Sequence, residues 1–358
     1  MRHTSARKDS TKHWSCMAEL RGNKNGNRLR LGFLGTGWIG LDRMQRIAES
    51  GFADVALICD SSTQVFAQAL KVAPSARLTN SYEELLSAGL DGVVIATPSA
   101  LHAEQAIHAL ENGLPVFCQK PLGRNATEVR AVVQAAQAAN RLLQVDLSYR
   151  FTEAMRIIRE KITAGDIGTV YACDLVFHNA YGPDKPWFYD RSLSGGGCVI
   201  DLGIHLVDLA LWTLASPPIT HVSSTLFAKG RPLTDGEVED YAIATLRLNC
   251  DVAVRIACSW NLPAGCDAII SADFYGTKGG LSFHNVNGSF YDFVAEEFHG
   301  TARKLLCSPP DAWGGRAAVT WAVQLSRNPG FDPEVAHVIE VAEALDTIYA
   351  AGASDILA

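Results

Sequence analysis

Polar residues form a single stripe in the otherwise apolar segment 199–214. Asp201, His205, Asp208 and Trp212 follow one another at intervals of four, three and four residues. Because successive residues of an α-helix turn by about 100°, these side chains fall in one narrow sector of the predicted helix. The apolar flanks predict that the helix is buried, and a carboxylate and an imidazole buried with it need partners or a polar cavity. Two interpretations are open: a core histidine satisfied by a carboxylate, or a stripe that faces a functional site.

The first half of the chain alternates between short apolar runs and helical patterns. Apolar runs of this kind are typical of parallel strands buried on both faces. The pattern predicts strands at 29–34, 55–59, 93–96, 116–118 and 142–145, and helices at 38–49, 63–71, 82–87, 100–111 and 126–139. This alternation predicts a right-handed, doubly wound α/β domain with a parallel sheet.

A glycine-rich turn follows the first predicted strand directly and opens the first predicted helix. It fits G-x-G-x-x-G, with a glycine for the tight turn, one for close approach of a pyrophosphate and one for helix–strand packing. The free N–H groups and the positive end of the helix would hold the phosphates. The residues predicted to bind the cofactor here are Gly35, Thr36, Gly37, Trp38, Ile39 and Gly40.

Asp60 ends the second predicted strand, twenty residues after Gly40. A carboxylate at that point accepts hydrogen bonds from the adenosine ribose hydroxyls. It also repels the 2'-phosphate of NADP, and the following Ser61 and Ser62 supply no arginine to hold one. The sequence therefore favours NAD over NADP.

Two further segments end strands at the edge of the sheet where ligands bind, beyond the carboxyl ends of the strands. In the first segment, Ser99 follows Pro98 and is predicted to cap the helix that carries His102. In the second, a lysine at a strand end is either a solvated surface residue or a neighbour of the nicotinamide. The candidate cofactor contacts are Thr97, Pro98, Ser99, His102, Gln119 and Lys120.

The second half of the chain is dominated by strand patterns separated by glycine, proline and asparagine, which predicts an antiparallel sheet. Strands are expected at 170–177, 222–227, 241–248, 252–260, 268–275 and 280–283, after a helix at 152–163. A closing helix at 333–350 is expected to pack back on one of the domains. The expected organisation is a disordered or transit-peptide-like extension at 1–28, a dinucleotide-binding domain at 29–149 and an α+β domain at 150–358.

Composition narrows the classes of function. With 48% hydrophobic and 19% charged residues the chain is typical of a globular protein, and its net charge of −7 argues against a nucleic-acid partner. It has neither an apolar run long enough for a membrane span nor an N-terminal signal-peptide pattern, so we expect a cytoplasmic protein without a membrane partner. Nine cysteines without a C-x-x-C pair indicate reduced thiols rather than disulfides or a metal site.

The ordered set of these motifs, with Tyr149-Arg150-Phe151 and Gly195-Gly196-Gly197 before the striped segment, resembles the glucose–fructose oxidoreductase, inositol dehydrogenase and rhizopine catabolism (Gfo/Idh/MocA) family. The resemblance implies a Rossmann domain followed by a large, mostly antiparallel sheet whose open face forms a homo-oligomer, a dimer or tetramer. It also implies a catalytic group of Lys120, Asp201 and His205. Two positions depart from the family: Gln119 stands where glutamate is usual, and Ser99 where asparagine is frequent.

The resemblance implies an NAD(P)-dependent oxidoreductase that transfers a hydride between nicotinamide and a secondary alcohol or ketone of a sugar, polyol or related compound. The loop after residue 179 is either a surface loop with packing aromatics or a wall of the substrate pocket, because aromatic rings suit the C–H face of a sugar. The candidate substrate contacts are Tyr149, Arg150, Asn179, Tyr181, Trp187 and Asp208.

Histidine exchanges protons near neutrality, so His205 is the expected acid/base and Lys120 the group that steadies the alkoxide, with the reverse assignment open. Asp201 would orient one of the two. Two other functions stay open: a glycoside-cleaving enzyme that uses transient oxidation by bound NAD followed by elimination, and a noncatalytic cofactor-sensing regulator.

Overall fold

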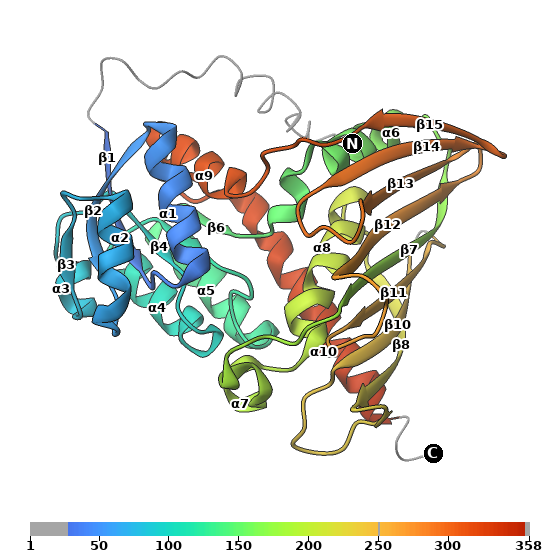
Figure 1. The fold of residues 1–358 in the computed structure, drawn as a ribbon, viewed down its shortest axis with the longest axis horizontal. Coiled ribbons are helices and arrows are strands. Elements are labelled where there is room, and N and C mark those ends of the chain that lie inside the picture. Colours follow the sequence, from blue (N-terminus) through green and yellow to red (C-terminus); the bar gives the residue numbers. More distant parts are fainter. Residues whose placement is uncertain (1–27, 250, 355–358) are drawn as a thin grey trace, which may run out of the picture.

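The fold is two sheets with helices between and around them (Figure 1). The structure, a computed structural model, describes residues 28–249 and 251–354. The expected extension at 1–28 therefore lies outside the described residues, apart from Arg28. Within the described part, one sheet has six strands and the other nine.

The first sheet is parallel throughout, in the order β3-β2-β1-β4-β5-β6. This confirms the predicted Rossmann-like sheet. Its strands are β1 (Leu29–Leu34), β2 (Ala53–Cys59), β3 (Arg77–Thr79), β4 (Gly92–Ile95), β5 (Val116–Cys118) and β6 (Leu143–Val145). The sequence pattern did not predict β3, because this short edge strand buries only one of its three residues.

Helices cover both faces of the first sheet. They are α1 (Trp38–Ser50), the 3₁₀ turn η2 (Thr63–Val65), α2 (Phe66–Val72), α3 (Tyr82–Leu86), α4 (Ser99–Glu111) and α5 (Ala126–Ala139). The prediction that Ser99 caps α4 is wrong. Pro98, with an extended ψ of 145°, occupies the cap position, and Ser99 is already the first residue of the helix.

The second sheet runs in the order β15-β14-β13-β12-β7-β11-β10-β8-β9 and is antiparallel except for the pair β7 and β11. Its strands are β7 (Val170–Asn179), β8 (Ile219–Ala228), β9 (Arg231–Pro232), β10 (Tyr241–Leu248), β11 (Ala253–Ser259), β12 (Ala268–Gly276), β13 (Gly280–Asn285), β14 (Phe293–His299) and β15 (Ala302–Cys307). Three of these were not predicted. β9 has only two residues, both exposed, Glu296 and Glu297 interrupt the apolar alternation of β14, and the edge strand β15 is largely exposed.

The striped segment is buried between the two sheets but is not one continuous α-helix. The prediction of a regular α-helix over 199–214 is wrong at its first turn, which is the π-helix η5 (Val199–Gly203); α8 (Ile204–Thr213) follows. Ile204 N–H bonds to the carbonyl of Val199, five residues earlier. The whole segment Arg191–Thr213, which includes α7 (Arg191–Ser194), is apolar enough to cross a membrane, but 83% of its apolar window is buried, as in a core helix.

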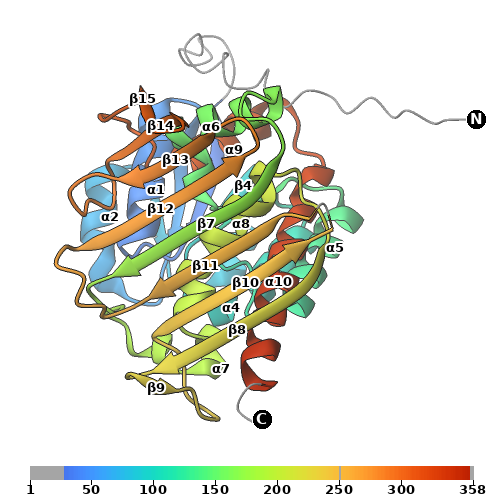
Figure 2. The same cartoon turned by 90° about the vertical axis from the view of Figure 1, so that its right-hand side faces the viewer.

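The C-terminal helices join the two sheets. α9 (Arg316–Arg327) packs on α1 in the first domain, where Trp321 is fully buried with its ring centroid 5.8 Å from that of Phe117. The 3₁₀ turn η6 (Pro333–Ala336) leads into α10 (His337–Ser354), which lies against α5, α8 and β8. In Figure 2 the outer face of the nine-stranded sheet turns to the viewer, and among the described residues no helix covers it.

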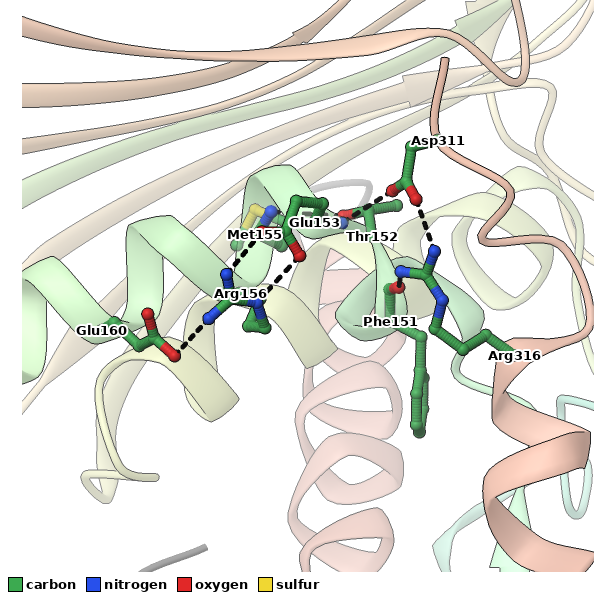
Figure 3. Close-up of polar contacts among 8 residues, drawn as sticks. All are labelled: Phe151, Thr152, Glu153, Met155, Arg156, Glu160, Asp311 and Arg316. Atoms are coloured by element: carbon green, nitrogen blue, oxygen red, sulfur yellow. Dashed lines mark hydrogen bonds and ion pairs between the residues drawn. The ribbon is translucent and has the colours of Figure 1, made fainter. Parts of the chain in front are cut away.

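The crossing from the first sheet to the second is fixed by a polar cluster at the 3₁₀ turn η3 (Ser148–Phe151) and the start of α6 (Glu153–Ala164) (Figure 3). The Thr152 hydroxyl accepts the Met155 N–H at 3.2 Å, and Asp311 accepts the Glu153 N–H at 2.7 Å. Arg316, the first residue of α9, donates to the Phe151 carbonyl and to Asp311, both at 2.5 Å. These bonds hold η3 and its residues Tyr149 and Arg150 between the domains.

Candidate active site

The glycine turn leaves open space where a pyrophosphate would lie. Gly35 has a φ of +84°, and a Cβ there would lie 2.7 Å from the Ala96 backbone. A Cβ on Gly40 would lie 2.2 Å from the Gly35 carbonyl oxygen, whereas one on Gly37 would meet nothing within 4 Å. Each glycine therefore meets the requirement that the fingerprint predicts for it.

The remaining residues of the turn differ in exposure. Thr36 is buried, Ile39 is half-buried and the Trp38 indole is 73% exposed at the first position of α1. The Thr36 N–H donates to Asp60 Oδ2 at 2.8 Å, and the Ser62 N–H donates to Asp60 Oδ1 at 2.9 Å. The half-buried carboxylate therefore lies beside the turn, where the sequence predicts contact with a ribose.

His102 joins the ends of β4 and β5. Its ring nitrogens lie 2.7 Å from the carbonyl oxygen of Pro121 and 2.6 Å from that of Thr97. The imidazole is 1% exposed, and burial lowers its pKa below the ordinary value. The Thr97 hydroxyl donates to Gln105 at 2.6 Å, and Ser99 is buried. Both ring nitrogens of His102 are thus occupied by backbone carbonyls that follow β4 and β5. Direct contact of His102 with a cofactor stays a prediction.

Lys120 and Asp201 form an ion pair that connects the two domains. Lys120 Nζ donates to Asp201 Oδ1 at 2.6 Å and to the Asp201 backbone carbonyl at 2.8 Å. The two side chains are 20% and 17% exposed. Trp260 Nε1 donates to the other carboxylate oxygen, Asp201 Oδ2, at 3.1 Å. Of the two partners that the sequence left open for Asp201, the structure gives it the lysine.

His205 lies one turn further along the same helix and is 6% exposed. Its ring packs against Tyr149 with the ring centroids 4.9 Å apart, and against Phe177 at 6.2 Å. Its Nδ1 is buried and has no hydrogen-bond partner in the described part of the chain. Burial, and then the charge of Lys120, lower the pKa of His205 well below its ordinary value. The imidazole is therefore neutral near pH 7 and able to accept a proton.

Asp208 and Arg150, both predicted to contact substrate, are each other's partners. Arg150 Nε donates to Asp208 Oδ2 at 2.7 Å, and a second nitrogen donates to the other oxygen. Asp208 is 1% exposed. Burial raises the pKa of this aspartate above its ordinary value, and the charge and hydrogen bonds of Arg150 offset only part of that rise. The Trp212 ring lies 5.5 Å from the Arg150 guanidinium and 4.4 Å from that of Arg159. Asp208 of the striped segment is thus in a buried ion pair with Arg150, next to the Trp212 indole. Contact of Asp208 or Arg150 with substrate stays a prediction.

The other predicted substrate residues lie around the end of β7. Asn179 Oδ1 is buried without a partner among residues 28–249 and 251–354. The Tyr181 hydroxyl donates to Asp267, and this ring is 58% exposed. The half-buried Trp187 stacks on Phe188 at 3.8 Å between ring centroids. Only Asn179 of this group presents an unsatisfied buried polar atom.

Sequence reasoning missed two residues that shape the site. Trp260, the indole donor to Asp201, was taken only as the end of a strand; it shares the inward alternation of Val254, Ile256 and Cys258. Glu239 is 1% exposed, and its Oε1 accepts the N–H groups of Gly197 and Val199, each at 2.9 Å. The alternation could have identified the tryptophan. No sequence signal marked the glutamate, which lies in a loop.

Comparison with known proteins finds matches to both parts of the chain. Residues 29–147 match a family model described as an oxidoreductase family with an NAD-binding Rossmann fold, and residues 155–282 match a GFO/IDH/MocA C-terminal domain. The rhizopine catabolism protein MocA of Rhizobium meliloti is 32% identical over 57% of this chain and 65% of its own length. The inositol 2-dehydrogenase of Acidiphilium cryptum (strain JF-5) is 30% identical over 67% and 71%.

The D-glucoside 3-dehydrogenase of Escherichia coli (strain K12) is 27% identical over 64% of this chain and 69% of its own. Two solved structures share the fold. A levoglucosan dehydrogenase in complex with NADH has a TM-score of 0.78 at 21% identity, covering 92% of this chain and 98% of its own. GenD2 from gentamicin A biosynthesis, in complex with NAD, has a TM-score of 0.76 at 23% identity, covering 93% and 97%.

Proposed function

The chain belongs to the GFO/IDH/MocA oxidoreductase family, with its NAD-binding Rossmann domain. On this premise we propose that it oxidises a secondary alcohol of a sugar or polyol, or reduces the matching ketone. The observation that carries the proposal is the Lys120–Asp201 ion pair, which lies at the carboxyl edge of the first sheet beside a buried, neutral His205. A base and a fixed cation next to each other are what alcohol oxidation requires of the protein.

Bound at the glycine turn, NAD would supply the acceptor for the hydride of the carbinol carbon. The protein must remove the hydroxyl proton and stabilise the negative charge that develops on the oxygen. His205 is proposed to accept that proton, because its imidazole is held neutral by burial. Lys120 is proposed to stabilise the alkoxide, since Asp201 fixes its ammonium group through two hydrogen bonds. In the direction of ketone reduction, the same histidine returns the proton.

Four observations support the choice of cofactor and substrate class. The open space at Gly37 fits a pyrophosphate, and the Asp60 carboxylate fits an unphosphorylated ribose better than a 2'-phosphate, which favours NAD. On the substrate side, the unpartnered Asn179 Oδ1 is suited to accept a hydroxyl hydrogen bond. The names of the relatives, which are inositol, glucoside and levoglucosan dehydrogenases, point to the same class.

A screen of NAD and NADP reduction tests the proposal. Purified protein is incubated with a panel of polyols, sugars and sugar acids, and NADH formation is followed by absorbance. The expected result is turnover on at least one polyhydroxy compound, with NAD preferred. Binding of NAD without turnover on any member of the panel, or release of free sugar from glycosides without net NADH, would contradict it.

The uncovered outer face of the nine-stranded sheet is proposed to join a second copy of the chain. Its exposed apolar side chains include Tyr171 on β7, Ile243 on β10 and Ile269 on β12, which are 55%, 40% and 38% exposed. A face of this kind on a large sheet is typical of a protein interface. Analytical ultracentrifugation should find a dimer or tetramer that Ile243→Arg dissociates; a monomeric wild-type protein would contradict this.

A further inference from the structure

Gln119, one of the two positions where this chain departs from its family, belongs to a buried polar trio with Arg43 and Asp146. Gln119 and Asp146 directly follow the neighbouring strands β5 and β6, whose last residues, Cys118 and Val145, are register partners. Arg43 lies on α1, the helix that begins at the glycine turn. All three side chains are buried: Gln119 is 7%, Asp146 1% and Arg43 6% exposed.

One carboxylate oxygen holds the other two groups. Asp146 Oδ2 accepts from Arg43 Nε at 2.6 Å and from Gln119 Nε2 at 2.5 Å. Because the carboxylate only accepts, the amide nitrogen of Gln119 must face it, and the amide cannot turn over without placing two oxygens in contact. Two acceptors of the trio have no partner in it: Gln119 Oε1, and Asp146 Oδ1, which is buried without a hydrogen-bond partner among the described residues. Of these, Gln119 Oε1 belongs to the residue next to Lys120 at the sheet edge.

The charge count explains why glutamine fits here. The trio contains one carboxylate and one guanidinium, so it is neutral. A glutamate at 119 would place a second carboxylate against Asp146 Oδ2 in a buried setting with a single arginine, and buried like charges at this distance are strongly unfavourable. The other charged groups near position 119 are Asp42, which accepts from Arg43, and Lys120, the next residue in the chain.

We propose that Asp146, neutralised by Arg43, orients Gln119 so that its amide oxygen accepts a hydrogen bond from the cofactor ribose. Asp146 and Arg43 are positioning residues, since both act through Gln119. This inference rests on the proposed use of NAD. The test measures only NAD affinity, so its outcome does not depend on whether an alcohol substrate has been found.

Exchanging the two side chains tests the proposal. Gln119→Glu and Asp146→Asn are made singly and together, and NAD affinity is measured by isothermal titration calorimetry between pH 6 and 8.5, with melting temperatures as a check on folding. The double variant keeps one carboxylate, one amide and one guanidinium. Gln134→Glu, on the exposed side of α5, is the matched control for an added negative charge.

Each single variant should bind NAD about tenfold more weakly or worse, the effect of one charge-assisted hydrogen bond, and the double variant should recover to within about threefold of wild type. Gln119→Glu alone should also lose affinity as the pH rises, because its two facing carboxylates share a proton only at low pH. Wild type, Gln134→Glu and the double variant should show no such loss. Equal affinity of Gln119→Glu and wild type at every pH, or a double variant no better than the weaker single variant, would overturn the proposal.

Discussion

Gly37 and Gly40 are three residues apart in one turn, yet a methyl group meets different surroundings at each. At Gly37 it enters open space, and the backbone there has an extended conformation that alanine adopts freely. At Gly40 it meets the Gly35 carbonyl oxygen at 2.2 Å. One position therefore reports on the ligand and the other on packing.

Gly37→Ala should leave the free energy of unfolding within about 0.5 kcal/mol of wild type but weaken NAD binding at least about tenfold, because the methyl group fills the phosphate space. Gly40→Ala should lose about 1–3 kcal/mol of stability through overpacking. Urea denaturation and calorimetry measure the two quantities. NAD binding unchanged by Gly37→Ala would show that the phosphates lie elsewhere.

At the scale of elements, Glu239 caps the helix that carries Asp201 and His205. Its Oε1 accepts two backbone N–H groups and the Tyr349 hydroxyl, at 2.9 Å each, and so joins the loop before β10, η5 and α10. Removing the Glu239 carboxylate would leave three donors without an acceptor. Removing the Tyr349 hydroxyl would take away only one of the three hydrogen bonds that the carboxylate accepts.

Glu239→Ala should therefore cost roughly 3 kcal/mol or more in unfolding free energy, and Tyr349→Phe about 1–2 kcal/mol. Chemical denaturation of both variants gives the comparison. Since the cap fixes the turn containing Asp201, Glu239→Ala should also slow turnover more than it changes NAD affinity. A smaller loss of stability for Glu239→Ala than for Tyr349→Phe would contradict this role.

Elements with strong periodicity were predictable, and those shaped by tertiary contacts were not. The glycine turn, Asp60 and Lys120 could be placed because their roles depend on position relative to a strand. The π-helical first turn could not, since it depends on contacts with residues distant in sequence: Lys120 at the Asp201 carbonyl and Glu239 at the N-terminus. Similarly, the pairing of Arg150 with Asp208 depends on where η3 crosses α8, which no local pattern encodes.

Over the whole molecule, burial keeps several histidines neutral. Burial lowers the pKa of His102, His178 and His205, and lowers that of His337 to about 3. In the unfolded chain these groups titrate near about 6.5. Below that pH the unfolded state binds protons that the folded state does not, so folding stability falls as the pH falls; above it, these histidines contribute no pH dependence.

The free energy of unfolding, measured in urea between pH 7.5 and 5.5, should decrease on acidification with a slope of up to about 1.4 kcal/mol per pH unit for each buried histidine. His337→Gln should reduce the slope, and the exposed His108→Gln should not. Stability that rises from pH 6.5 to 5.5 would contradict the account of the buried histidines.

Single-turnover hydride transfer tests the central claim most directly. Wild type, His205→Asn and Lys120→Met are mixed with NAD and the best alcohol of the panel, and NADH formation is followed from pH 6 to 10. The wild-type rate should not show the fall near pH 6.5 that an ordinary histidine base would give, because burial lowers the pKa of His205 below its usual value. Loss of the base should slow the step about 10²–10⁴-fold, and Lys120→Met should slow it through loss of the cation. Unchanged rates in both variants would contradict the assignment of this site.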